Sequence, residues 1–204
     1  MNRLITFVFL FIFQISYSQD FSARMWHSGW LVTMEGDTLR GDIKYDMPNN
    51  AVQIIVEKQK QKKVFTFSSK KLMYFQIFDN NLKNYRQFYS IPYRIRRDYR
   101  APVLFEVLYE GRLTLLLRER IVIENDPYQS YMYAGTSSTT ERLVFTYYFV
   151  DRTGKIILYE GQKGEIYEIF AKHAEAVRKY VKDNKLKLDD MRDLVRVTAF
   201  YNSL

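Results

Sequence analysis

The chain has no cysteine among its 204 residues, and it has only two histidines, four prolines and eight glycines. The missing cysteine excludes disulfides, thiolate metal ligands, cysteine nucleophiles and lipid attachment through a cysteine. Two histidines leave little for metal or nucleophile chemistry, and no His-x-x-x-His pair, glycine-rich phosphate loop or Gly-x-Ser-x-Gly motif occurs. We therefore expect no metal site and no cofactor, and the sequence nominates no catalytic residue.

The first 18 residues have the pattern of a secretory signal peptide. A basic start precedes an apolar run from Leu4 to Ile15, and the small residues Ser16 and Ser18 follow it. The run is shorter than the ~20 residues of a membrane-spanning helix. We therefore expect a signal peptide over residues 1–18 with cleavage near Ser18. The mature chain would not span the membrane and would be periplasmic or extracellular.

The sequence from Trp26 to Glu160 consists of about ten short β-prone runs separated by turns, a spacing typical of antiparallel sheets. The clearest pair spans 30–45, where two such runs flank Glu35-Gly36-Asp37. Two stretches interrupt this rhythm. Residues 57–63 are polar and predict a solvated hairpin tip, whereas 124–141 form a long segment that predicts a mobile or functional loop.

After Gly164 the apolar residues recur with a helical period, and Asp189-Asp190 favour the start of a second helix. His173 lies on the apolar side of the first helix, which favours a structural role. The expected fold class is α+β and mainly β, with an antiparallel barrel-like or sandwiched sheet followed by two C-terminal helices. The expected organisation is a β-rich domain over 19–163 and a helical segment over 164–204 packed on the same core.

The densest candidate surface is the stretch 85–100, which is rich in arginine and aromatic residues and contains a single acid. Arginine binds carboxylate, sulfate and phosphate through paired hydrogen bonds, so an acidic glycan or another envelope component could bind there. The sequence thus nominates six ligand-binding residues: Tyr93, Arg94, Arg96, Arg97, Tyr99 and Arg100. The simpler interpretation is a half-buried sheet with aromatics inward and arginines outward. Nucleic acid is not an expected partner, because export would separate the protein from it.

The sequence leaves three other interpretations open. Glu124 and Asp126 could supply the acid and base of a hydrolase, although most such pairs are solvated loop charges. Trp26 and Trp30 could form a sugar platform, although a core role is simpler. An outer-membrane barrel has a suitable strand number, but Arg118-Glu119-Arg120 within a strand and the helical C-terminus argue against it.

The run Gly29-Trp30-Leu31-Val32 followed by Gly36-Asp37-Thr38-Leu39-Arg40-Gly41-Asp42-Ile43 resembles the opening hairpin of uncharacterised exported proteins of Bacteroidetes. The C-terminal stretch from Leu194 to Asn202 resembles their helical tails. The resemblance implies a β-rich envelope protein and brings no catalytic residues. The expected function is an exported, non-enzymatic binding or structural module, with an exported carboxylate-dependent hydrolase as the alternative and an outer-membrane barrel as a weaker one.

Overall fold

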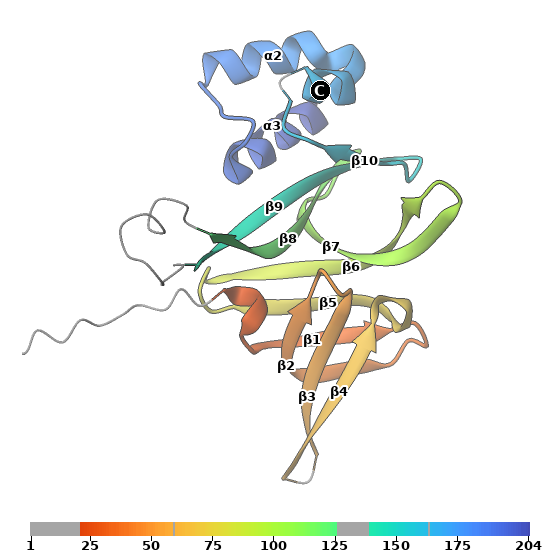
Figure 1. Ribbon diagram of the computed structural model, residues 1–204. Helices are drawn as coiled ribbons and strands as arrows, with labels where there is room; N and C mark the ends of the chain where they lie inside the picture. Colours follow the sequence, from red (N-terminus) through yellow and green to blue (C-terminus); the bar gives the residue numbers. More distant parts are fainter. Residues whose placement is uncertain (1–20, 59, 126–138, 163) are drawn as a thin grey trace, which may run out of the picture.

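The computed structural model describes residues 21–58, 60–125, 139–162 and 164–204, and these contain ten strands (Figure 1). The strands are β1 (His27–Thr33), β2 (Thr38–Asp46), β3 (Ala51–Lys58), β4 (Gln61–Ser68), β5 (Leu72–Asp79), β6 (Asn84–Arg96), β7 (Tyr99–Tyr109), β8 (Leu113–Asn125), β9 (Thr139–Asp151) and β10 (Ile156–Tyr159). The helices are α1 (Glu165–Phe170), α2 (Ala174–Asp183) and α3 (Met191–Ser203). Short 3-10 turns include Ser22–Arg24 before β1.

All ten strands form one open sheet in the order β10-β9-β8-β7-β6-β5-β1-β2-β3-β4. Every neighbouring pair is antiparallel. The predicted fold class is confirmed, since a mainly antiparallel sheet precedes two C-terminal helices, the first formed by α1 joined to α2. The predicted hairpin over 30–45 is formed by β1 and β2, and its turn contains Gly36 at φ 91°, a conformation that glycine adopts without strain.

The first core lies inside the curved half of the sheet formed by β1–β3 and β5–β7. The side chains of β5 are distributed over two faces, as in the other strands. Leu72, Phe75 and Ile77 are buried in the core, whereas Tyr74 and Gln76 lie half-buried on the other face. One apolar cluster joins six strands: Leu31, Ile43, Tyr45, Met47, Val52, Ile54, Val56, Leu72, Phe75, Ile77, Phe88 and Leu104. Only Phe67 of β4 packs against it, and only partly, so β4 stays at the open edge of the sheet.

The second core lies between the helices and strands β8–β10, at the top of Figure 1. Apolar residues of α1, α2 and α3, such as Phe170, Val177 and Leu194, pack against Leu115 and Phe149 of the sheet. The helices therefore cover one face of this half of the sheet. No helix in the described ranges is long and apolar enough to cross a bilayer.

The first C-terminal helix is interrupted at Ala171, which adopts φ 45° and ψ −117°. This conformation cannot continue a right-handed helix, so α1 ends and a short 3-10 turn leads into α2. The interruption lets Phe170 stay buried against Phe149, with ring centroids 5.8 Å apart. Helix α3 begins as the sequence predicts, because the Asp190 side chain accepts hydrogen bonds from the N–H groups of Arg192 and Asp193.

A third apolar cluster fills the space between two diverging hairpins. Strands β7 and β8 pair only between Glu106–Tyr109 and Leu115–Leu117, and beyond these residues hairpin β6–β7 separates from strands β8–β10. The cluster packs side chains of both parts against each other, with Phe105, Leu116 and Tyr148 at its centre. The end of hairpin β6–β7 thereby faces the turn between β9 and β10.

Two predicted loops are shorter than expected. The polar stretch 57–63 is mostly strand, because β3 continues to Lys58 and β4 begins at Gln61. Strands β3 and β4 pair along their apolar parts, and the same hydrogen-bonded ladder continues through these polar residues. Likewise β8 reaches Asn125 and β9 begins at Thr139, so the ends of the predicted loop 124–141 are strand and residues 126–138 lie outside the described residues.

Candidate functional site

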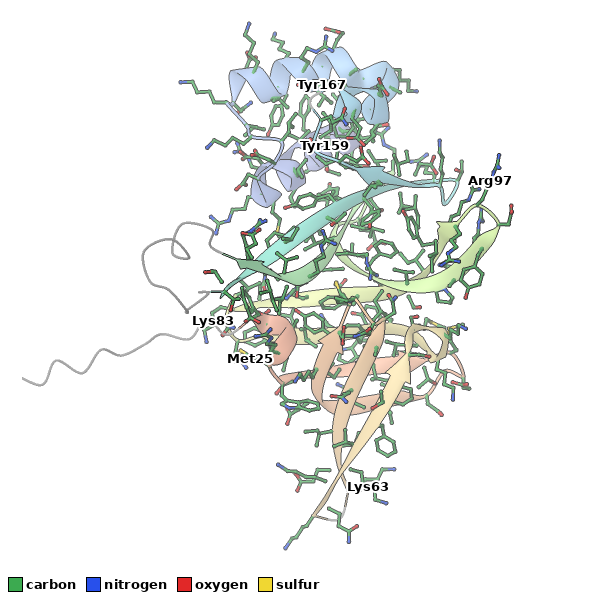
Figure 2. The ribbon with its side chains drawn as sticks, viewed as in Figure 1. Met25, Lys63, Lys83, Arg97, Tyr159 and Tyr167 are labelled. Carbon is green, nitrogen blue, oxygen red and sulfur yellow. The ribbon has the colours of Figure 1, made fainter. Side chains whose placement is uncertain are left out.

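The six predicted binding residues all lie at the end of hairpin β6–β7: Tyr93, Arg94, Arg96, Arg97, Tyr99 and Arg100. Figure 2 labels Arg97 at the tip of this hairpin. Arg94 and Arg100 are direct cross-strand partners, and the pairing shifts between Arg94 and Arg96, which leaves Ile95 in a bulge. A bulge changes the direction in which neighbouring side chains point. The hairpin therefore does not present its four arginines as one uniform row.

Two of the arginines line a pocket of roughly 410 Å³ between hairpin β6–β7 and the turn that joins β9 to β10. We call it the basic pocket, and its lining residues are Pro92, Tyr93, Arg94, Arg100, Thr153, Gly154, Lys155 and Ile156. Three of the six predicted residues thus meet there, whereas Arg96, Arg97 and Tyr99 do not line it. Lys155, more than fifty positions away in the sequence, joins them only because the third core holds the two segments together.

The basic pocket has a strong positive excess. Its lining contains three cationic side chains, Arg94, Arg100 and Lys155, and no acidic one. None of the three forms an ion pair with another residue in the described part of the chain. Like charges directly opposite each other on neighbouring strands are destabilising, so the Arg94–Arg100 pair has an energetic cost that an anion would offset.

The carboxylate nearest to Lys155 in the turn is already occupied. Asp151 accepts hydrogen bonds from the hydroxyl of Thr153 at 2.6 Å and from the N–H groups of Thr153 and Lys155 at 2.8 and 3.0 Å. The hydrogen bond from Thr153 is the main cause that holds the pKa of Asp151 below its ordinary value. The N–H groups of Thr153 and Lys155 are therefore already hydrogen-bonded to Asp151. An anion in the pocket would bind the three cationic side chains instead of these backbone groups.

The aromatic wall of the basic pocket is fixed by packing. The Tyr93 ring meets Phe105 and Tyr148 edge to face, with centroids 5.7 and 5.6 Å apart. Phe105 is fully buried, and Tyr148 is buried to all but 9 %. A rigid wall reduces the conformational entropy that ligand binding must overcome.

The expectation that arginines of 85–100 point outward and aromatics inward is wrong at Arg86. This residue is buried, with 4 % exposure, whereas Tyr85 is 68 % exposed. The physical reason is strand alternation, because Arg86 shares its face of β6 with Phe88, a residue of the first core. The inward position is tolerable because acids surround the guanidinium.

Arg86 lies in a buried polar cluster at the boundary between the curved sheet and β8. It donates to both carboxylate oxygens of Glu106, at 2.8 and 2.6 Å, to Asp79 at 3.1 Å and to Glu119 at 3.0 Å. The Tyr45 hydroxyl accepts from Arg86 at 2.7 Å and donates to Glu119. Three carboxyl groups therefore share one guanidinium, and each of the three is less than 7 % exposed.

The cluster shifts the protonation of its members in opposite directions. Burial raises the pKa of Glu106 above its usual range, against the attraction of Arg86. Burial also disfavours the charged form of Asp79, but hydrogen bonds from Ser22, Leu82, Arg86 and Asn81 hold its pKa below the usual value. Burial alone would lower the pKa of Arg86, but the hydrogen bond and charge of Glu106, with the charges of Tyr45 and Glu119, keep this pKa well above its ordinary value. The guanidinium is thus permanently charged and is the partner that keeps these acids in the core.

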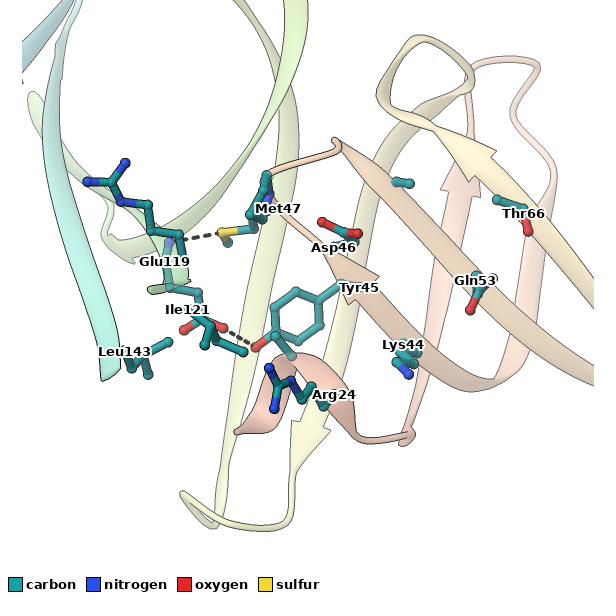
Figure 3. A pocket seen from close by; sticks show the side chains of 14 residues that line it. Arg24, Lys44, Tyr45, Asp46, Met47, Gln53, Thr66, Glu119, Ile121 and Leu143 are labelled. Carbon is teal, nitrogen blue, oxygen red and sulfur yellow. Dashed lines mark hydrogen bonds between the residues drawn. The ribbon is translucent and has the colours of Figure 1, made fainter. Parts of the chain in front are cut away.

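A second pocket, also roughly 410 Å³, opens above this cluster between β2–β4 and the hairpin β8–β9 (Figure 3). Tyr45 and Glu119 lie in its lining, and the figure shows their mutual hydrogen bond together with the one from the Glu119 N–H to the Met47 sulfur. The other charged lining residues are Arg24, Lys44, Asp46 and Arg120, and Arg24 forms an ion pair with Glu141. The buried polar atoms of this pocket bind one another, and its excess of unpaired cationic side chains is smaller than that of the basic pocket.

The predicted hydrolase pair is not brought together in the described residues. Glu124 is exposed and accepts hydrogen bonds from Arg142, which lower its pKa, and Asp126 lies outside the described residues. Neither histidine lies in the lining of the basic pocket. His27 is buried and its Nε2 is 2.8 Å from the carbonyl oxygen of Ser22, while His173 is half-buried with its ring against Tyr201.

The two tryptophans do not form a joint platform or a joint core. Trp26 is 38 % exposed, and Trp30 is half-buried on the face of β1 opposite the first core. Trp30 donates to Gln76 and packs beside Tyr74, whose ring in turn lies 4.7 Å from that of Tyr89. Strands β1, β5 and β6 therefore carry a continuous aromatic row on the outer face of the curved sheet.

No family model, no curated protein and no solved structure matches the chain.

Proposed function

We propose that the protein is an exported binding module without catalytic activity, and that it binds an acidic glycan through the basic pocket. The observation that carries this proposal is the meeting of three unpaired cationic side chains, from two distant segments, in a pocket whose lining contains no acid. Arginine pairs bind carboxylate and sulfate groups with two parallel hydrogen bonds each. The pocket volume lies within the range of sites that bind small organic molecules.

Aromatic side chains favour a sugar over a small inorganic anion. Tyr93 lies in the pocket lining, and by strand alternation it shares the outer face of β6 with Tyr89, the last ring of the aromatic row. The two residues are about 13 Å apart along the strand. Tyrosine offers an apolar ring face together with a hydroxyl group, which suits a sugar ring with its apolar and polar sides. A glycan with its acidic group in the basic pocket could therefore also touch this face.

The test is to measure binding of two probes, polygalacturonate for carboxylates and heparin for sulfates, at several salt concentrations. Replacement of Arg94, Arg100 and Lys155 together by glutamine should weaken binding by at least about tenfold and flatten its salt dependence. The matched control replaces Arg96 and Arg97 by glutamine, because they lie on the same hairpin but outside the pocket lining.

The proposal requires the two sets of substitutions to differ. Equal losses in both variants would mean that the probes bind the hairpin by its overall charge alone. Absence of salt-sensitive binding to either probe by the unsubstituted protein would remove the acidic glycan as the ligand. The fold of each variant is checked by its thermal transition, which exposed side chains should change little.

A further inference from the structure

Strand β4 forms an unpaired edge of the sheet. It is the last strand in the order and pairs only with β3, so the backbone groups along its other side have no strand partner among the described residues. Every residue of β4 is exposed except Phe67, which is half-buried. An exposed edge of this kind can pair with an added strand, and natural proteins usually protect it.

The inner face of this edge is hollowed and is lined by both apolar and basic side chains. A groove of roughly 450 Å³ lies there, which we call the edge groove, lined by Leu39, Val56, Lys58, Gln61, Lys63 and Phe65. Val56 and Leu39 belong to the first core or pack against it, and Phe65 remains 42 % exposed. The open edge of the sheet and an incompletely covered part of the core therefore coincide.

The charge at the edge selects the partner. The lining of the edge groove contains two lysines and no acid, and neither lysine forms an ion pair in the described ranges. Strand β4 itself carries Lys62 and Lys63 and no acidic residue. A second copy of β4 would bring no carboxylate to these lysines, whereas an acidic peptide would neutralise them.

We infer that β4 and the edge groove bind an extended, acidic segment of a partner protein, which adds to the sheet as an antiparallel strand. Backbone hydrogen bonds would supply affinity, and alternate side chains would supply specificity. On the inner face, the partner residue opposite Phe65 would be apolar, and the one opposite Lys63 would be acidic. Because these positions are two residues apart and the strands antiparallel, the recognised order is apolar, any residue, acidic.

The test measures by fluorescence anisotropy how tightly an acetylated, fluorescein-labelled peptide binds the full mature chain. The peptide sequence is valine-threonine-valine-threonine-glutamate-threonine-threonine. One control peptide carries lysine in place of glutamate, and another carries N-methyl groups on alternate backbone nitrogens. We expect the glutamate peptide to bind at least about tenfold more tightly than either control. Hydrogen exchange of the β4 amide groups should slow when the glutamate peptide is bound.

Two variants separate the edge groove from the overall charge. Lys63→Glu should reverse the preference between the glutamate and lysine peptides. Lys62→Glu makes the same charge change at the adjacent position, whose side chain alternates to the other face of β4, and it should leave the preference in place. Figure 2 shows Lys63 near the far end of the β3–β4 hairpin.

Several results would overturn the inference. These are no binding at millimolar peptide, equal binding of the N-methylated peptide, or the same response to both lysine substitutions. Self-association through β4, seen in sedimentation as a dimer that Phe65→Lys abolishes, would identify a second copy of the chain as the occupant instead. Loss of glycan binding in the basic-pocket variant has no bearing on these measurements, because the two sites share no lining residue.

Discussion

Replacement of Arg86 by methionine should destabilise the protein severely. Methionine keeps much of the packing volume but removes the only guanidinium that Asp79, Glu106 and Glu119 share. All four side chains are buried, so water cannot replace the lost partner. Removal of one partner from a buried ion pair typically costs about 3–5 kcal/mol of unfolding free energy. The three carboxyl groups left behind place the expected loss at the upper end of this range.

Urea unfolding measures this loss. With a slope of about 2 kcal/mol per molar urea, a loss of about 5 kcal/mol lowers the midpoint by about 2.5 M. The matched control is Arg142→Met, because Arg142 also binds a carboxylate from a strand of the sheet but is 58 % exposed. Solvent screens an exposed pair, so the control should move the midpoint little.

The pH dependence of the Arg86→Met variant provides a second readout. Without the cation, burial and mutual repulsion should raise the pKa values of Asp79 and Glu106 in the folded state above those in the unfolded chain. Such groups bind more protons when folded, so the variant should lose stability as the pH rises through their raised pKa values and regain it at lower pH. Equal midpoints for Arg86→Met and Arg142→Met, or a deficit independent of pH, would refute the structural role of the cluster.

Further predictions concern the termini and the same cluster. N-terminal sequencing of envelope protein should find Gln19 or Asp20 first, and an intact Met1 in soluble cytoplasmic protein would contradict export. Asn202→Ala should cost about 1–3 kcal/mol of unfolding free energy, because Asn202 bonds both backbone groups of Leu113, and an unchanged midpoint would disprove this. The ionised Asp79 carboxylate stabilises the folded state, and this contribution is lost as the pH falls from 3.8 through the lowered pKa of Asp79. Asp79→Asn should therefore reduce the loss of stability over this pH interval.

The features that the sequence predicts well are local. The hairpin of β1 and β2 follows from two β-prone runs around Gly36, and the start of α3 follows from the cap at Asp190. In both cases the determining residues are within a few positions of each other. The strand ends near residues 57–63 are harder to predict. These residues are polar, but the pairing of β3 with β4 continues through them from the apolar part of the hairpin.

The buried cluster shows why other features could not be predicted. Its members come from five strands, and their contacts span up to 74 positions in the sequence. A partial signal exists, since Arg86 alternates with Tyr85 and Gln87 and thus shares a face with Phe88. That signal is ambiguous, because either face of β6 could be the buried one. The partners Glu106 and Glu119 are what make the inward arginine stable, and only the strand order reveals them.

The contribution of Lys155 to the basic pocket was likewise hidden. The sequence nominated the basic hairpin, two of whose arginines line the pocket, but nothing local connects Arg94 or Arg100 with the turn between β9 and β10. The third core makes this connection through rings such as Tyr93 and Tyr148. The packing of the two segments thus determines which two of the four predicted arginines line the basic pocket, and it leaves Arg96 and Arg97 outside the lining.

Two of the arginines of strand β6, Arg86 and Arg94, lie in opposite environments. Comparing their variants tests whether the residues that stabilise the fold are separate from those that bind the ligand. Arg86 has three acidic partners, whereas Arg94 has none among the described residues and faces Arg100 instead. Arg94→Gln should therefore weaken binding to the acidic polysaccharide while it leaves stability unchanged or slightly higher, because it removes a like-charge pair. Arg86→Met should lower stability, and any protein that remains folded should still bind the polysaccharide. Glycan affinity and the urea midpoint, measured on both variants, should thus change independently. A common loss of both properties in both variants would mean that the basic pocket is part of the folding core and that the lost affinity reflects unfolding, not the loss of a binding residue.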